Sequence, residues 1–108
     1  MEKVERYINE DGKVGVLISP GYGAGWSTWN DNKEFCLFDK RLVELAIAGV
    51  CEEEVEEQIE SMDIGHVCCS GWEDVVIHWV EPNEMFVVDE YDGSESLTYL
   101  SCIRTFTA

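Results

Sequence analysis

Basic residues are nearly absent from the second half of this 108-residue chain. Residues 51–108 contain fifteen acidic side chains and one base, Arg104, so that half carries a net charge of −14. Residues 1–50 contain eight acids and six bases, and the two halves add up to the chain's −16. This scarcity of bases argues against direct binding to nucleic acid, because phosphate contacts need Lys and Arg. It favours a partner that is itself positively charged.

Long apolar runs are missing too, and the first residues lack the hydrophobic stretch of a secretory signal peptide. We therefore expect neither a membrane span nor secretion. An odd number of cysteines then favours reduced thiols in a cytosol over a disulfide framework. Three of them, Cys36, Cys51 and Cys102, are expected to be buried and unpaired.

Motifs that carry chemistry are also lacking. The cluster of His66, Cys68 and Cys69 has no CxxC pair and no second ligand pair at a zinc-type spacing, so we predict no metal. No nucleophile elbow or triad-like context surrounds Ser27, His66 or His78. The sequence predicts no catalytic residue and no cofactor, and an enzyme is the least favoured of three functions considered.

The residues that are present predict one small acidic α+β domain over residues 1–108. Apolar residues make up 45% of the chain, and twelve residues are aromatic, enough for a single core. Alternating apolar residues and turn dipeptides such as Asp92-Gly93 predict strands, while Asp39 and Gly49 are suitable caps for a helix. The expected order is ββ-αα-βββ, an antiparallel sheet of about five strands with two helices on one face. The strands are expected at residues 3–9, 13–19, 72–81, 85–90 and 95–106, and the helices at residues 39–48 and 52–62.

The first candidate site is an acidic ridge. On a helix, Glu53, Glu56, Glu57 and Glu60 fall at i, i+3, i+4 and i+7, so their side chains follow one another along a single face. Their spacing of about 5–6 Å is comparable with that of successive phosphates along a nucleic-acid strand. We predict that these residues, with Glu73 and Asp74, bind a basic protein. The alternative is an ordinary solvated helix face.

The second candidate is a loop rich in glycine and tryptophan. Its alternating glycines permit a close approach to a ligand, and its two tryptophans offer flat stacking surfaces. Two bases at the start of the following helix lie where the helix dipole disfavours cations, which a bound anion would compensate. The alternative prediction is thus a site for a small, nucleotide-like ligand; a purely structural loop is the other explanation. The residues of this alternative site are Gly21, Gly23, Gly25, Trp26, Trp29, Lys40 and Arg41.

Three segments give the chain a resemblance: SPGYGAGWSTWN at residues 19–30, GWED at residues 71–74 and EYDGSES at residues 90–96. Together they resemble a group of short proteins of unassigned activity encoded by bacteriophages and prophages. The resemblance implies no catalytic or binding residue. It implies a small phage product acting in the cytoplasm of a host bacterium. We therefore expect a non-enzymatic acidic protein that inhibits a basic host protein, such as an immune effector that binds nucleic acid.

Overall fold

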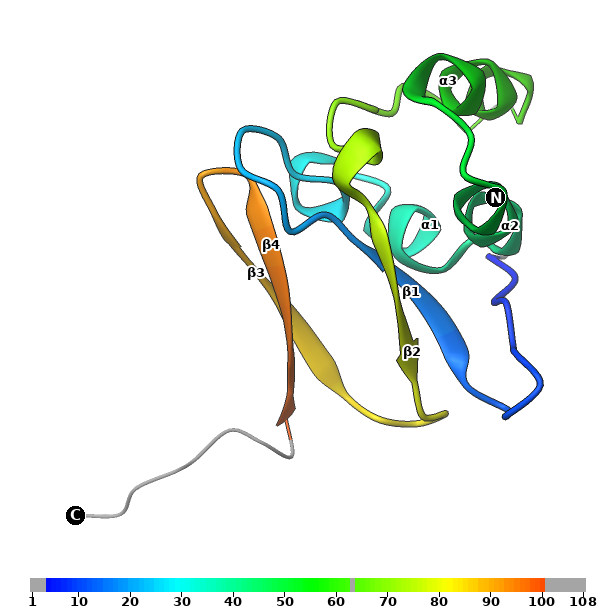
Figure 1. The fold of residues 1–108 in the computed structure, drawn as a ribbon, viewed down its shortest axis with the longest axis vertical. Coiled ribbons are helices and arrows are strands. Elements are labelled where there is room, and N and C mark those ends of the chain that lie inside the picture. The colour runs from blue at the N-terminus through cyan, green and yellow to red at the C-terminus, as the bar shows by residue number, and fades with distance from the viewer. Residues whose placement is uncertain (1–3, 63, 101–108) are drawn as a thin grey trace.

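The structure, a computed structural model, describes residues 4–62 and 64–100. The described part is an α+β fold with three helices and two antiparallel sheets of two strands each. Two short 3-10 helices, η1 and η2, lie in the loops before α1 and before β2 (Figure 1). The elements in chain order are β1 (Val14–Ile18), η1 (Ser27–Trp29), α1 (Lys33–Phe38), α2 (Lys40–Ala48), α3 (Glu52–Ser61), η2 (Trp72–Asp74), β2 (Val76–Val80), β3 (Phe86–Tyr91) and β4 (Ser94–Tyr99).

Strand β1 is buried on both faces and separates two hydrophobic clusters. Leu17 points into the larger cluster, which it shares with buried residues of α1, α2 and α3. Val16 and Ile18 point the other way and pack with Phe86 and Leu97 of the β3–β4 hairpin. Val16 and Ile18 share a face because side chains two positions apart in a strand point the same way. The β1–β2 sheet therefore lies between helices and the β3–β4 hairpin (Figure 1).

The predicted cap residues of the helix that begins after Asp39 are confirmed. Asp39 accepts a hydrogen bond from the backbone N–H of Arg41 at 2.9 Å, which satisfies a free donor at the start of α2. Gly49 ends α2 in the left-handed conformation with φ of 72°. Helix α3 buries Val55 and Ile59, which lie one helical turn apart on the face opposite solvent.

The prediction of two helices misses α1. This helix has only six residues and ends where Asp39 adopts φ −55° and ψ 124°. The side chain of Asp39 then starts α2 at once. Because Asp39 both ends α1 and caps α2, no turn residues separate the two helices in the sequence, and α1 could not be recognised as a separate helix.

The predicted five-stranded sheet is not what the structure contains. Residues 4–9 of the expected first strand form only isolated bridges, Arg6 with Asp39 and Ile8 with Val14. The chain then turns tightly into β1. The side chain of Asn9 closes this turn, because it accepts hydrogen bonds from the N–H groups of Asp11 and Lys13. The remaining strands form the pairs β1–β2 and β3–β4 rather than one continuous sheet.

The three C-terminal strands occur, with altered bounds. The predicted strand at 72–81 shortens to β2 because its first three residues form η2. The strand predicted at 95–106 appears as β4, and its residues 101–106 lie outside the described residues. Asp92 and Gly93, with φ of 52° and 86°, form the predicted two-residue turn that pairs Tyr91 with Ser94.

Gly93 also allows a close contact that a side chain would obstruct. A Cβ atom at this position would collide with the backbone N of Ala24. We expect Gly93→Ala to lower the free energy of unfolding by about 1–2 kcal/mol for its positive φ and by about 1–3 kcal/mol more for the collision. Urea denaturation of both variants separates the two effects. Gly12 also has a positive φ but has open space around it, so Gly12→Ala reports the cost of the backbone conformation alone, and the difference between the two variants reports the collision. Equal losses in the two variants would contradict the contact.

Candidate interaction surface

The loop between β1 and α1 is organised by one buried carboxylate. Glu95 of β4 is only 2% exposed. Its Oε1 accepts from the N–H of Ser19 at 2.9 Å, and its Oε2 accepts from the N–H groups of Trp26 and Thr28 at 2.7 and 3.0 Å. The hydroxyl of Thr28 donates to the same Oε2 at 2.6 Å. The loop donors that the alternative site would offer to a ligand anion are thus used inside the protein.

The alternating glycines serve close packing within the chain. Gly21 lies against the carboxylate of Asp74, and Gly25 lies under the indole of Trp29. Gly23 donates its N–H to the carbonyl of Asp92 at 2.9 Å. These contacts join the loop to η2 on one side and to the β3–β4 turn on the other.

The two tryptophans of the loop differ in environment. Trp26 is fully buried, donates its Nε1–H to the carbonyl of Cys36 at 2.7 Å and packs edge-to-face on Trp72. Trp29 is 45% exposed and donates its Nε1–H to Oε1 of Glu90 at 3.0 Å. Trp26 is therefore a core residue, whereas Trp29 is available at the surface.

The bases assigned to the alternative site do not join the loop. Arg41 donates from Nε and Nη2 to the two carboxylate oxygens of Asp39 at 3.1 and 3.0 Å. This internal carboxylate supplies the negative charge that we had expected from a bound anion. Lys40 is exposed, and its backbone N–H donates to the carbonyl of Glu5. An anion site built from the loop N–H groups and these two bases finds no support in this geometry.

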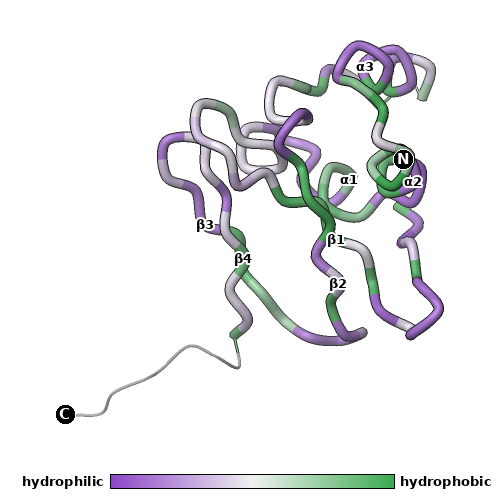
Figure 2. Tube along the Cα trace, in the orientation of Figure 1, coloured by the Kyte–Doolittle hydropathy of each residue, from purple (hydrophilic) through white to green (hydrophobic). Residues whose placement is uncertain are grey.

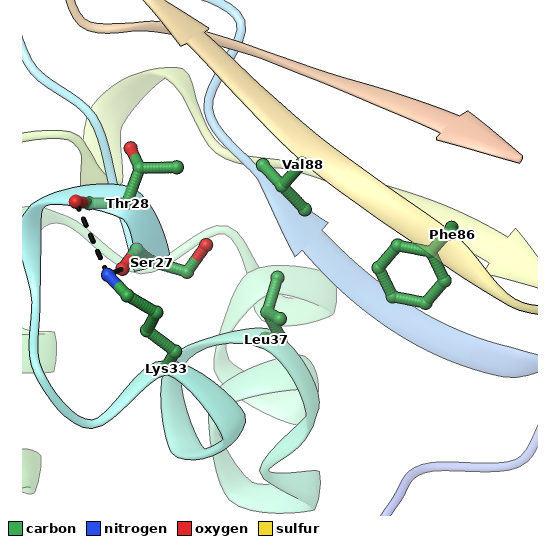
Figure 3. Close-up of a pocket in the computed structure, with 6 residues that line it drawn as sticks. All are labelled: Ser27, Thr28, Lys33, Leu37, Phe86 and Val88. Carbon is green, nitrogen blue, oxygen red and sulfur yellow. Dashed lines mark hydrogen bonds between the residues drawn. The ribbon is translucent and has the colours of Figure 1, made fainter. Parts of the chain in front are cut away.

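Lys33 is a residue that the sequence analysis did not single out. Its ammonium donates to the carbonyls of Ser27, Thr28 and Asn30, at 3.1, 3.4 and 2.8 Å, and so closes the end of η1. It also borders a pocket of about 280 Å³ between η1, α1 and β3 (Figure 3). The pocket has mainly apolar walls, and its lining residues are Ser27, Thr28, Lys33, Leu37, Phe86 and Val88. None of the predicted ligand-binding residues lines it.

The predicted acidic residues lie on one end of the molecule together with others. We call this set the acidic edge; all its members are exposed. Figure 2 shows hydrophilic stretches along α3 and the β3–β4 hairpin, and Figure 1 places α3, the lime-coloured η2 and the β3–β4 turn at the same end. The members of the acidic edge are Glu53, Glu56, Glu57, Glu60, Glu73, Asp74, Glu90 and Asp92.

Specific contacts make the acidic edge continuous. The side chain of Glu73 accepts from the N–H of Glu52 at 2.9 Å, which ties η2 to the start of α3. The side chain of Asp74 packs against Gly21 of the glycine–tryptophan loop. The N–H of Gly23 in the same loop donates to the carbonyl of Asp92 in the β3–β4 turn. The turn between β2 and β3 lies at the other end of the fold, where Glu81 pairs with Lys13 at 3.7 Å (Figure 1). Most of the described acids of the second half are therefore at one end, while Glu81 and Glu84 lie in the β2–β3 turn at the other end and Glu95 is buried.

The cysteines only partly follow the prediction. Cys36 is buried as expected, but Cys51 is exposed because it precedes α3 at the surface, and Cys102 lies outside the described residues. Burial, reinforced by the neighbouring Cys69 and Glu95, raises the pKa of Cys36 from 9.0 to about 12. Burial, with Glu56 and Glu52 nearby, raises the pKa of Cys69 to about 11. In the described ranges, no three His, Cys, Asp or Glu side chains are placed to hold a metal ion.

Comparisons with protein-family models, with curated proteins and with solved structures give no significant match for this chain. None of the described helices combines the length and apolar character needed to cross a membrane.

Replacement of the buried carboxylate tests its role in the loop. In Glu95→Gln an amide NH2 group faces backbone N–H donors, and one or more donors lose their acceptor. We expect the free energy of unfolding to fall by about 2–4 kcal/mol, measured by urea denaturation. The matched control is Glu90→Gln, the exposed cross-strand neighbour of Glu95, which should change stability little. Similar stabilities for both variants would contradict the central role of Glu95.

The thiol pKa values predict an order of modification. At pH 8 a thiol with a pKa of 12 is ionised to only about one part in ten thousand, so iodoacetamide should label exposed Cys51 well before Cys36 and Cys69. Peptide mass spectrometry after timed labelling measures this order. Protonated buried thiols also stabilise the fold fully below pH 9, and this contribution is lost as the pH rises towards 11 and 12. Early labelling of Cys36 in folded protein would contradict its burial.

Proposed function

We propose that this chain is a non-enzymatic binding protein that uses its acidic edge to inhibit a basic protein. The observation that carries this proposal is the continuity of eight exposed carboxylates across α3, η2 and the β3–β4 turn. In the part of the chain that the structure describes, none of the four ridge carboxylates of α3 forms an ion pair. Their charge is therefore available to a partner rather than balanced within the fold.

The acidic edge is suited to a protein that normally holds nucleic acid. Side chains one helical turn apart present carboxylates at about 5–6 Å, and such a row competes for the Lys and Arg side chains that would otherwise contact phosphates. The expected resemblance to phage proteins is consistent with this proposal, because a phage product would meet basic proteins of its bacterial host. Inhibition would follow from occupation of the partner's nucleic-acid surface.

A second candidate function is small-ligand binding, and one observation favours it. The 280 Å³ pocket beside Lys33 is open and mainly apolar, which suits a small ligand better than the glycine loop does. Against a nucleotide-like ligand, the ammonium of Lys33 already donates to three carbonyls, and the loop N–H groups of Trp26 and Thr28 donate to Glu95. We therefore rank this function second.

The proposal predicts that binding depends on where the acids lie and not only on their number. We expect Glu53→Gln/Glu56→Gln/Glu57→Gln/Glu60→Gln to weaken binding of a nona-lysine peptide by about ten-fold or more at about 50 mM NaCl, with a smaller effect at about 200 mM. Isothermal titration calorimetry measures both affinities. Binding of nucleotides, followed by indole fluorescence, should be absent in all variants.

A charge-matched control separates the acidic edge from net charge. The variant Glu5→Gln/Glu10→Gln/Glu34→Gln/Glu44→Gln removes the same number of exposed carboxylates from other parts of the molecule. It should retain most of the affinity for nona-lysine. Equal losses in the two variants would show that only total charge matters, and the proposed interface would then be wrong.

A further inference from the structure

Three large aromatic side chains are exposed at the acidic edge. Tyr22 is 75% exposed, Tyr91 is 78% exposed and Trp29 is 45% exposed. Exposed Trp and Tyr side chains are common at the energetic centres of protein interfaces, where they supply contact area at a small entropic cost. Because these aromatic side chains lie beside carboxylates, they suit a partner that presents cationic side chains.

The three aromatic residues surround one junction between the loop and the β3–β4 turn. Tyr22 and Tyr91 are the chain neighbours of Gly23 and Asp92, whose backbones are hydrogen-bonded to each other. Trp29 reaches the same hairpin through its hydrogen bond to Glu90. We call these three side chains, with Glu90 and Asp92, the aromatic junction.

Hydrogen bonds within the protein hold the backbone of the aromatic junction in place. The hydroxyl of Ser94 donates to the carbonyl of Pro20 at 2.6 Å, and the N–H of Glu95 donates to the carbonyl of Ser19 at 2.8 Å. The side chain of Glu95 holds the other side of the loop, and Glu95 pairs across the hairpin with Glu90. A partner therefore does not have to order this surface, which removes one cost of binding.

Trp29 and Glu90 place a partly exposed aromatic ring directly beside a carboxylate. The indole donates through its Nε1–H edge to Oε1 of Glu90, and Oε2 of Glu90 has no hydrogen-bond partner among the described residues. A guanidinium can stack on an aromatic face while it donates in its own plane to a carboxylate. The ammonium of lysine has no plane to stack and is more strongly hydrated.

We propose that the aromatic junction binds arginine side chains of the basic partner and so makes the acidic edge selective for arginine over lysine. This inference rests on the proposed function and adds to it a recognition element for one type of base. The α3 ridge then supplies attraction to any cation, whereas Trp29 with Glu90 distinguishes a guanidinium from an ammonium.

The test compares nona-arginine and nona-lysine peptides on the full chain by isothermal titration calorimetry. Trp29→Ala should weaken nona-arginine binding about three- to ten-fold and nona-lysine binding less than about two-fold. Trp29→Phe keeps an aromatic face but loses the N–H that holds Glu90, and it should fall between wild type and Trp29→Ala. The control is Ile47→Ala, which shortens an exposed apolar residue of α2 and should change neither affinity.

A second variant keeps the test valid if the loss of Trp29 disturbs the fold. Glu90→Gln preserves the side-chain shape and should also lower the arginine-to-lysine affinity ratio. In the wild type, nona-arginine should quench the fluorescence of the exposed indole, and Trp29→Phe should lose that part of the signal. A ratio unchanged by both Trp29→Ala and Glu90→Gln would overturn this inference and leave the acidic edge intact. Failure of both peptides to bind the wild type would overturn the proposed function itself.

Discussion

The burial of Glu95 is the constraint on which the arrangement of β1, η1 and the β3–β4 hairpin depends. A carboxylate away from water is stable only when its lone pairs are satisfied, and Glu95 obtains its four donors from Ser19, Trp26 and Thr28. These donors come from residues almost seventy or more positions earlier in the chain. One side chain of β4 therefore fixes the end of β1, the start of η1 and the position of the β3–β4 hairpin. The two small sheets are joined here by this carboxylate and by one backbone hydrogen bond, from the N–H of Glu95 to the carbonyl of Ser19, and not by a shared ladder.

The same constraint explains the division between core and surface in the glycine–tryptophan loop. Because the loop N–H groups turn inward to Glu95, Trp26 follows them into the core and packs on Trp72. Trp29, three residues later in η1, is turned to the surface beside Glu90. Glycines at positions 21 and 25 admit the close neighbours that this compact path requires. The buried part of the loop, around Trp26, therefore holds the fold together, and the exposed part, around Trp29, is a candidate contact surface.

Local signals in the sequence predicted local structure well. Asp39, Gly49 and the Asp92-Gly93 turn act through short-range hydrogen bonds or backbone φ values, and each has its predicted role. Strand pairing was less predictable, because whether β1 and β4 share a ladder depends on distant residues. The role of Glu95 was hidden for the same reason: no local pattern distinguishes this buried glutamate from the exposed acids of the second half. The exposed ridge of α3 followed directly from helical spacing.

Repulsion among the carboxylates of the acidic edge lowers the stability of the free protein, and this affects how a partner would bind. Glutamates one turn apart on α3 repel each other, and α3 is anchored by few buried residues, chiefly Val55 and Ile59. A basic partner of the kind proposed would relieve this repulsion as it binds, so part of the binding free energy would come from removing the repulsion of the free state. The aromatic junction would contribute differently, because it adds exposed aromatic rings to the carboxylates of Glu90 and Asp92. On the proposed function, charge on α3 would govern attraction and its dependence on salt, while stacking at Trp29 would govern which cation is preferred.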